Sequence, residues 1–492
     1  MASEMKKLSF IEKTGYSLGD GAANFVFMAM ILFQLNFYTD TMGIVAWIAG
    51  PLLFVGRLWD AFFDPMMGLI ADRTNTRWGK FRPWVLWTAI PWGIMMVLAY
   101  TVPGFSKPMT IVYACVTNIL LMTLYSANNT PYSAMTAVMT DDVNERTTLS
   151  SFRFVAAMIA QLVVGGFTIP FVEKFGQGNN AKGWSMTMGL WATVCIVFFV
   201  ITFLTTRERI LPDPKQSKSS GQDFKNLLQN GPWIAMFILA LSHFIYVAMR
   251  GSGMYYYFIY YVDKNSALNM LSMLGLGAST ENASGFGHWL LDGLGFIVKA
   301  DKSNVTGVAY SIFNIFSQLT TVVGVVLSTF LAMKFGKKLV ATVCFATTTV
   351  FLAMFILLPA NNLKATFALE FVRALSYAPT IPLIWAMFAD VVDYAEWTTG
   401  RRTTGVIYAT ILFGLKMGLS IGVGISGLLL SAYGYEAGKV QTPLALQGIR
   451  MTVSIYPSIF LVIIVVCLLR YKINKKLNLQ IQDELIERRK KF

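Results

Sequence analysis

Long apolar stretches, separated by short polar segments, recur along almost the whole chain of 492 residues. A helix needs about 20 residues to cross a bilayer, and about a dozen stretches reach that length. Hydropathy and the positions of chain breakers therefore predict an all-α membrane protein with about 12 transmembrane helices. The predicted helices cover residues 15–39, 44–71, 82–103, 109–139, 150–173, 186–206, 233–262, 305–334, 338–360, 364–392, 404–432 and 447–470.

The longest polar segment, residues 207–231, divides these helices into two groups of six. We interpret it as a cytoplasmic linker between an N-terminal bundle, 1–206, and a C-terminal bundle, 232–470. Each half carries a charged patch after its fourth helix, TDDVNERTTLSSFR and ADVVDYAEWTTGRR. Such matching halves fit the parallel-repeat plan of the major facilitator fold, in which two bundles rock about a central site.

Two segments depart from the repeat. Residues 263–303 form an outside insertion whose apolar pieces are too short to span a membrane. We expect short helices over the outer mouth, which either shape access or are a tolerated loop elaboration. The basic tail, 471–492, is predicted to be an amphipathic cytoplasmic helix, either resting on lipid headgroups or solvated.

Composition and charge support a membrane protein. The chain is 55% hydrophobic and only 13% charged, against roughly 25% charged residues in soluble domains. Its net charge of +14 does not require a nucleic-acid partner, because Lys and Arg concentrate in alternate loops and at both ends. The positive-inside rule then puts both termini in the cytoplasm, and we predict a multi-pass protein of the bacterial inner membrane.

Motifs of catalysis or of cofactor binding would indicate an enzyme or a bound cofactor. No nucleotide loop, metal-ligand cluster, nucleophile triad or fused catalytic domain is evident in the sequence. An enzyme or a receptor-like sensor is therefore not favoured, and no cofactor is expected.

The second predicted helix contains three charged residues, Arg57, Asp60 and Asp64, in GRLWDAFFDPMMG. A charge inside hydrocarbon costs at least ~2.5 kcal/mol, and their spacing puts all three on one face, so this face is expected to point inward. Two carboxylates one turn apart suit Na⁺, or a proton retained by mutual repulsion. Arg57 would compensate them when no cation is bound. The alternative is a buried ion-pair cluster that only holds helices together.

Polar residues of two neighbouring helices can meet a polyhydroxylated ligand. The fourth helix carries Tyr125 and Asn129 on one stripe with Ser126 adjoining, and the first carries Asp20 and Asn24 one turn apart. Amides and hydroxyls both donate and accept hydrogen bonds, and an aromatic ring can stack on the apolar face of a sugar. Hydrogen bonding between helices is the alternative role.

The second half adds buried charges of its own. Lys416 lies mid-helix and needs a carboxylate or ligand partner, while Arg250 precedes a run of tyrosines. Glu370 and Arg373 are spaced for a helical ion pair.

Charges at the predicted inside ends of helices suggest a gate. Clusters after the second, fourth and tenth helices can pair across the halves when the inside is shut and separate when it opens. Solvated loop charge is the alternative for some of them. The predicted gate and coupling residues are Arg57, Asp72, Arg73, Asp390, Asp393 and Arg401.

At these residues the sequence resembles the glycoside-pentoside-hexuronide cation symporters, the major facilitator family that includes the melibiose permeases. The elements that carry the resemblance are GDGAAN at 19–24, FYTDTMG at 37–43, RLWDAFFDPMMGLIADRTNTRWGKFRPW at 57–84, NTPYSA at 129–134, DDVNERTTLSSFR ending at Arg153, and ADVVDYAEW at 389–397. The resemblance implies an intracellular-facing pair of bundles. It also implies cation binding by Asp60, Asp64 and Ser126. It places Asn24, Tyr125, Asn129 and Arg153 at sugar-site positions, and Lys416 at the lysine of the family's eleventh helix.

Departures from the family pattern leave the substrate open. Asn24 and Asn129 stand where melibiose permeases have carboxylates that grip the sugar. A pocket without those charges, near Arg153 and Arg250, can admit an acidic sugar or a neutral one. Phe63 replaces a polar residue between the two acids, so both Na⁺ and H⁺ remain candidates for the coupling cation.

The sequence as a whole predicts a monomeric secondary transporter that couples a glycoside, pentoside or hexuronide to Na⁺ or H⁺ by alternating access. An uncoupled sugar facilitator or exporter, with the same acids as a structural latch, is the alternative. The predicted sugar-binding residues are Asp20, Asn24, Tyr125, Asn129, Arg153, Arg250 and Lys416.

Overall fold

The computed structural model describes residues 8–140, 143–209, 230–277, 285–400 and 404–490. Regular structure within these ranges is helical, and the one extended contact there is an isolated bridge between Thr76 and Gly79. Most of the predicted linker, residues 210–229, lies outside the described ranges. The predicted all-α class is therefore confirmed.

Helices of the first half follow the predicted apolar stretches closely. They are α1 (Phe10–Leu32), α2 (Gln34–Asn36), the π-helix η1 (Phe37–Thr41), α3 (Ala46–Arg73), α4 (Arg82–Ala99), α5 (Lys107–Met139), α6 (Val143–Gly176) and α7 (Asn180–Thr205).

The second half has the same plan with more interruptions. Its helices are α9 (Gly231–Tyr256), the π-helix η2 (Tyr257–Tyr261), α10 (Lys264–Met273), α11 (Phe286–Gly293), α12 (Val305–Phe335), α13 (Lys337–Met354), η4 (Phe355–Leu357), α14 (Leu363–Tyr377), α15 (Thr380–Thr399), α16 (Thr404–Ala432), α17 (Pro443–Val453), α18 (Ile455–Arg470) and α19 (Lys475–Lys490).

The helices are long and apolar enough for a multi-pass membrane protein. Among the described residues, 10 helical segments can cross a bilayer, and α1 with its bent continuation through η1 makes an eleventh. The shorter α4 contains several Trp and Pro residues and packs against α5 and α7. With α4 included, the predicted 12 transmembrane helices are accounted for.

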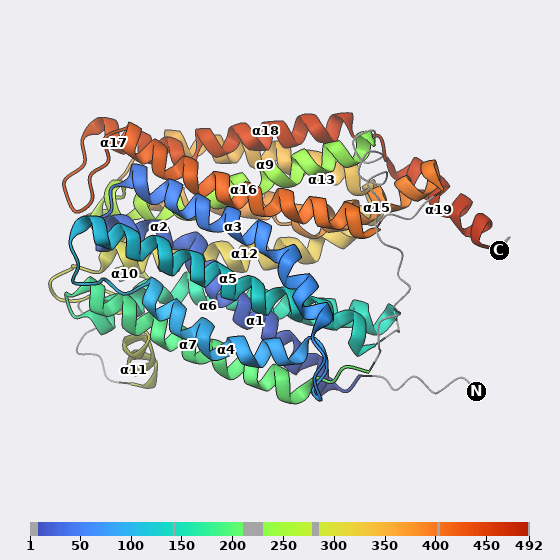
Figure 1. The fold of residues 1–492 in the computed structure, drawn as a ribbon. Helices are drawn as coiled ribbons and strands as arrows, with labels where there is room; N and C mark the ends of the chain where they lie inside the picture. Colours follow the sequence, from blue (N-terminus) through green and yellow to red (C-terminus); the bar gives the residue numbers. More distant parts are fainter. Residues whose placement is uncertain (1–7, 141–142, 210–229, 278–284, 401–403, 491–492) are drawn as a thin grey trace.

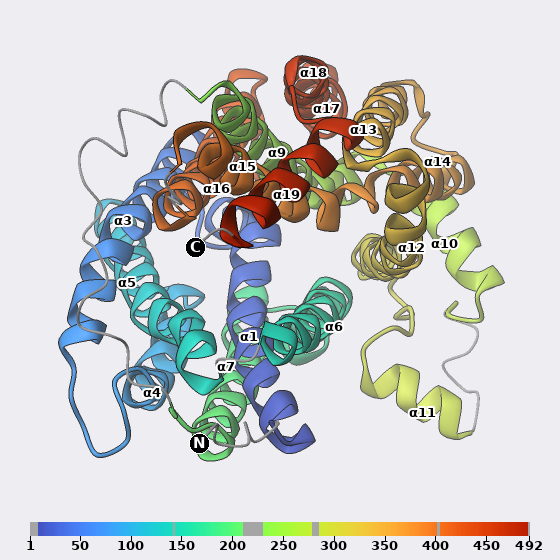
Figure 2. The same ribbon diagram turned by 90° about the vertical axis from the view of Figure 1, so that its right-hand side faces the viewer.

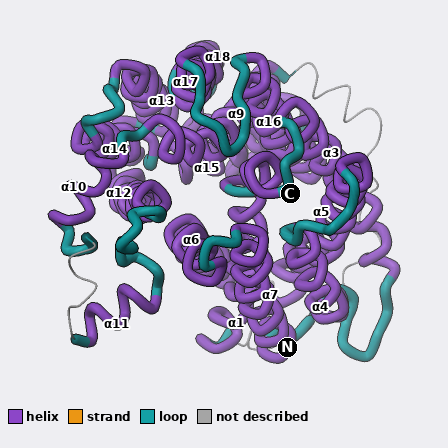
Figure 3. Tube along the Cα trace, turned by 90° about the vertical axis from the view of Figure 1, so that its left-hand side faces the viewer, coloured by secondary structure: helices purple, strands orange, loops and turns teal. Residues whose placement is uncertain are grey.

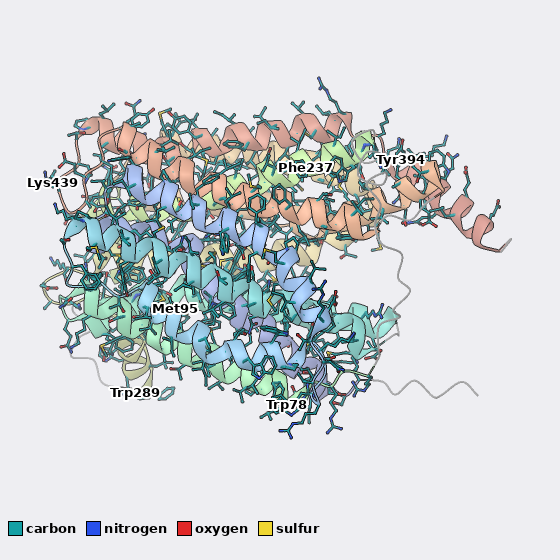
Figure 4. All side chains as sticks on the ribbon, in the orientation of Figure 1. Trp78, Met95, Phe237, Trp289, Tyr394 and Lys439 are labelled. Atoms are coloured by element: carbon teal, nitrogen blue, oxygen red, sulfur yellow. The ribbon has the colours of Figure 1, made fainter. Side chains whose placement is uncertain are left out.

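Two helix bundles lie side by side in Figure 1. They meet through α3 against α16 and through α6 against α12, one helix of each pair coming from each half. The bundles diverge toward the end where both termini lie, which faces the viewer in Figure 2. We call this the termini end and the opposite one the loop end; Figure 4 labels Tyr394 at the former and Lys439 at the latter.

Small residues set the crossing of α3 and α16. A Cβ atom added to Gly427 would lie 2.7 Å from the Cα of Gly50, and one added to Gly50 would lie 2.9 Å from the carbonyl oxygen of Gly424. Larger side chains would force the two backbones apart. Glycines therefore bring the two halves into close contact along this pair of helices.

The insertion forms short helices as predicted, but the predicted position over the outer mouth is wrong. Viewed from the loop end in Figure 3, α10 and α11 lie at one edge of the molecule. Their surroundings explain the displacement: Lys174 of α6 forms an ion pair with Asp292 at 3.2 Å, and the rings of Phe167 and Phe296 are 5.4 Å apart. These contacts fasten the insertion to the end of α6.

The tail forms the predicted helix, α19. Lipid headgroups or solvent were predicted to surround this helix, but part of it packs against protein. Its apolar residues Ile481 and Leu485 are buried, and α19 packs against α15. Trp397 Nε1 of α15 donates a hydrogen bond to Glu484 at 2.7 Å. The apolar face of the tail thus covers protein, which neither a headgroup-bound nor a fully solvated helix would do.

Candidate functional site

The charged face of α3 points into the protein. Arg57 and Asp60 are buried and Asp64 is 29% exposed, whereas the opposite face carries the exposed side chains of Trp59 and Phe62. This division follows from the helical period, because residues three and seven positions apart share a face. The inward orientation expected from the cost of burying charge in lipid is the one observed.

Two hydroxyl groups of α5 complete the surroundings of the acids. Ser126 Oγ donates a hydrogen bond to Asp60, and Thr130 Oγ1 donates one to Asp64 at 3.1 Å. Thr130 was not among the predicted site residues. Its signal in the sequence is its position four residues after Ser126, since that spacing stacks both hydroxyls on one helical face.

Lys416 reaches these acids from the other half of the molecule. Its Nζ lies 2.7 Å from Asp60 Oδ2 and also forms an ion pair with Asp64. The Tyr125 ring centroid is 6.0 Å from the same Nζ, within the range of a cation–π contact. The close crossing of α3 and α16 thus lets one ammonium group bridge two carboxylates of the opposite bundle.

A second group of predicted residues comes together between α1 and α6. Arg153 forms an ion pair with Asp20 at 3.0 Å, and its guanidinium lies 5.1 Å from the Tyr132 ring centroid. Asn24 accepts a hydrogen bond from Gln161 at 3.3 Å. Gln161 was missed by the sequence analysis and has no distinguishing signal in its apolar surroundings.

Two predicted site residues, Asn129 and Arg57, have side-chain groups without a hydrogen-bond partner among the described residues. Within the described residues, no hydrogen bond forms to the Asn129 side chain, although Asn129 lies on the same helix as Ser126 and Thr130. Arg57 Nη2 is buried and likewise has no hydrogen-bond partner there. These two groups retain hydrogen-bonding capacity that a ligand can use.

Arg250 belongs to a cluster of three charges in the second half. Glu370 receives hydrogen bonds from Arg250 and from Nε of Arg373 at 2.8 Å. Ser317 Oγ donates to the same carboxylate at 2.6 Å. The expected pair of Glu370 with Arg373 is present, while the participation of Arg250 and Ser317 was not predicted because it joins three separate helices.

A cavity of about 240 Å³ lies between the two halves beside this cluster. One wall is α6 of the first half, and the other walls are α9, α12, α14 and the start of α15 in the second. Its lining residues are Phe154, Ala157, Met158, Gln161, Tyr246, Val247, Arg250, Gly251, Ser317, Gln318, Thr321, Arg373, Tyr377 and Ile381.

Four of the predicted gate charges, Asp72, Arg73, Asp390 and Asp393, lie near the termini end, whereas Arg57 lies in the middle of α3. Asp390 pairs with Lys337 at 2.5 Å and accepts a hydrogen bond from Asn478 at 3.3 Å, so both partners belong to its own half. Asp72 and Arg73 are exposed at the end of α3. Asp393 follows Asp390 by one helical turn on α15, and Arg401 lies outside the described residues.

At the loop end, by contrast, the halves touch. Tyr435, between α16 and α17, donates a hydrogen bond to Asp40 of η1, and the hydroxyls of Thr39 and Tyr256 are 2.8 Å apart. Asp40 lies within the FYTDTMG element, and no role was predicted for it. The two halves thus touch at the loop end and diverge at the termini end, and the side of the membrane that each end faces stays a prediction.

Two helical bundles with charged groups and a cavity between them define the class of the protein: a membrane transporter of the major facilitator fold. The xylose transporter XylE from E. coli, in a partially occluded inward-open conformation, superposes with a TM-score of 0.57 over 95% of this chain and 98% of its own. At 11% identity this likeness supports the fold alone.

Sequence comparison places the chain more narrowly. The family model described as "MFS/sugar transport protein" matches residues 15–286 and 302–475. Two proteins of Escherichia coli (strain K12) are each 32% identical: the putative glycoside/cation symporter YagG, over 99% of this chain and 96% of its own, and the inner membrane symporter YicJ, over 95% and 91%. The chain belongs to this family of sugar transporters, and its resemblance to the glycoside-pentoside-hexuronide symporters is confirmed.

Proposed function

We propose that the protein is a secondary active transporter that moves a glycoside, pentoside or hexuronide together with Na⁺ or H⁺ by alternating access. Sugar transport follows from the family, and the relative YagG is named a glycoside/cation symporter. The cation is assigned to Asp60, Asp64 and Ser126, and we add Thr130. The sugar is assigned to the cavity between the halves and to the polar groups beside it.

One observation carries the proposal: a single ammonium group from one bundle bridges two carboxylates of the other. Asp60 and Asp64 face the Lys416 ammonium, lie on the same buried face as Arg57, and have hydroxyl oxygens beside both carboxylates. Carboxylate and hydroxyl oxygens are ligands that hard cations prefer. A free cation can therefore replace the Lys416 ammonium at the two acids. The cation then balances the carboxylate charge that the ammonium balanced before.

Displacement of Lys416 would link the cation to the sugar. The ammonium lies against Tyr125 and joins α3 to α16, so its release changes both the contact between halves and the surface of α5. Asn129, on the same helix as Tyr125, has no hydrogen-bond partner among the described residues and is assigned to the sugar. In thermodynamic terms, coupling is a shared free energy between the two sites, and each ligand strengthens the binding of the other.

A specific observation also supports the alternative of an uncoupled facilitator or exporter. The Lys416 ammonium and the buried Arg57 guanidinium already balance the two acidic charges, as a permanent structural latch would. The two functions differ in whether a cation can replace the ammonium.

Transport by purified protein in liposomes separates the two functions. A panel of radiolabelled glucosides, xylosides and glucuronides would be offered with an inward Na⁺ gradient, an inward proton gradient or neither. The proposal requires accumulation above the external concentration with one gradient only. Equal equilibration under all three conditions would establish the uncoupled alternative.

Placement in the cell completes the proposal. We assign the protein to the bacterial inner membrane, as its relative YicJ is named an inner membrane symporter, with both termini cytoplasmic and the protein acting as a monomer. Cysteine labelling of single-cysteine variants in intact cells, at Lys439 of the loop end and Lys476 of the tail, would test the orientation. Only the former should react with an impermeant reagent.

A further inference from the structure

The charged cluster of the second half carries more positive than negative charge. Arg250 and Arg373 contribute two guanidinium groups and Glu370 a single carboxylate, and all three side chains are at most 8% exposed. Burial of an uncompensated charge is costly unless a partner is present. The surplus positive charge therefore calls for an anion that the described residues do not supply at this place.

Glu370 has no capacity left for a ligand. Its Oε1 accepts hydrogen bonds from Ser317 and Arg373, and its Oε2 accepts from Arg250 and Arg373. A carboxylate accepts about four hydrogen bonds, so it is saturated. What the cluster can still offer is donors, because each guanidinium has five N–H groups and not all of them have protein acceptors.

The guanidinium groups border the cavity between the halves, while the carboxylate does not. Arg250 and Arg373 are lining residues of the cavity, and its described lining contains no Asp or Glu. Across the space, Gln161 of α6 offers an amide already connected to Asn24. At about 240 Å³ the cavity is smaller than the roughly 300–1,000 Å³ of drug-sized sites, so it suits a small ligand.

A purely structural role would not need the second arginine. Arg373 lies three residues after Glu370 on the same helix and already forms a two-pronged contact with it. That pair is neutral by itself. Arg250, from α9, adds the extra charge and also donates to the carbonyl oxygen of Val453 at 3.1 Å. Its addition makes the wall of the cavity basic.

We propose that Arg250 and Arg373 form an anion subsite and that the transported sugar carries an acidic group, a carboxylate above all, which binds there while its hydroxyls face α6. This inference rests on the proposed sugar transport and narrows the substrate class. Planar guanidinium groups match the geometry of carboxylates. One monovalent cation and one carboxylate would also enter together without adding net charge to the site.

Matched pairs of sugars test the inference directly. Methyl β-D-glucuronide and methyl β-D-glucoside differ only in a carboxylate for a hydroxymethyl group, and the corresponding galactosides give a second pair. Binding to the full-length purified protein would be measured by isothermal titration with Na⁺ present and absent. We expect at least one uronide to bind roughly tenfold more tightly than its neutral partner or better, a difference of about 1.4 kcal/mol.

Substitutions at Arg250 test whether this residue causes the preference for uronides over neutral glycosides. Arg250→Gln should abolish the uronide preference, measured as the ratio of the uronide and neutral-glycoside affinities of the same variant, and Arg250→Lys should retain part of the preference because it keeps the charge. Arg450→Gln is the matched control, since Arg450 lies on α17 against the Tyr261 ring and does not line the cavity. A preference unchanged in Arg250→Gln would overturn the assignment of this subsite.

The wild-type comparison remains decisive if Arg250→Gln does not fold. Equal affinity for both members of each pair, or no binding of either uronide, overturns the inference. Cation-driven accumulation of a neutral glycoside would then still support the proposed function. Conversely, tight uronide binding without any effect of Na⁺ or a proton gradient would uphold the inference and contradict coupled transport.

Discussion

The two buried charge clusters differ in their charge balance and in what they connect. The cluster on α3 and α16 joins two acids of one half to one lysine of the other, across the plane between the bundles. The Arg250 cluster lies within the second half and joins two arginines to one acid. The first also contains buried Arg57, so its two acids are balanced by two cations, and it spans the halves, as we propose for a cation site that is coupled to rocking. The second has surplus positive charge on the cavity wall that the second half supplies, which suits recognition of a substrate.

This comparison separates coupling from recognition. Changes to the cluster between the halves should alter cation dependence and the exchange between conformations. Changes to the cluster within one half should alter stability and selectivity, and leave the dependence on the cation in place.

Asp60→Asn should abolish cation-driven accumulation, a loss of at least about tenfold, because it removes the buried carboxylate that both Ser126 and Lys416 contact. Uptake into liposomes with and without a cation gradient measures this effect. Asp301→Asn, at an exposed position outside the proposed sites, is the control and should accumulate sugar normally. If Asp60→Asn kept full cation dependence, the cation site would have to lie elsewhere.

Glu370→Gln should destabilise the protein strongly. It leaves two buried guanidinium groups without their carboxylate, and breaking a buried ion pair in this way costs about 3–5 kcal/mol. The melting temperature of the purified protein should fall by several degrees. Glu436→Gln, in an exposed pair with Lys439, should leave it unchanged. Equal melting temperatures for wild type and Glu370→Gln would mean that the cluster contributes little to folding.

Lys416→Gln should strengthen cation binding by roughly tenfold, or about 1.4 kcal/mol, because the tethered ammonium no longer competes for the two acids. Transport should nevertheless slow, since the variant loses the ion pairs between α3 and α16 that we expect to control the exchange between conformations. Titration of the purified protein with Na⁺ or protons, followed by tryptophan fluorescence, would show the change. Weaker cation binding would instead indicate that Lys416 organises the site and does not compete for it.

Thr130→Ala should have the smallest effect, a fewfold loss of cation affinity, because one neutral hydrogen bond contributes about 0.5–1.5 kcal/mol. The same titration checks it. Thr123→Ala, two turns earlier on α5 and bonded to Trp59 on the exposed side of α3, is the matched control. Identical losses in both variants would show that Thr130 supports helix packing and is not a cation ligand.

Much of the architecture follows from local sequence alone. Apolar length predicts each transmembrane helix, and the cost of charge in hydrocarbon predicts that Asp60 and Asp64 face inward. The pairing of Glu370 with Arg373 follows from helical spacing. In each case the deciding interaction lies within one helix or between a helix and the bilayer, so neighbouring residues carry the information.

Other features were decided by contacts between distant segments. The position of α11 depends on Lys174 and Phe167 of α6, and the burial of α19 depends on α15. No local pattern contains these partners. Hydropathy can show that a segment is too short to span a membrane, but it cannot show which surface that segment will cover.

The sequence by itself determined that the chain crosses the membrane about 12 times and carries an inward acidic pair on its second span. Only the tertiary structure decided that Lys416 is the group facing that pair and that Arg250 joins Glu370 beside the cavity. The physical reason is that helical spacing fixes which residues share a face, whereas the crossing of two helices, here set by Gly50 and Gly427, fixes which faces meet.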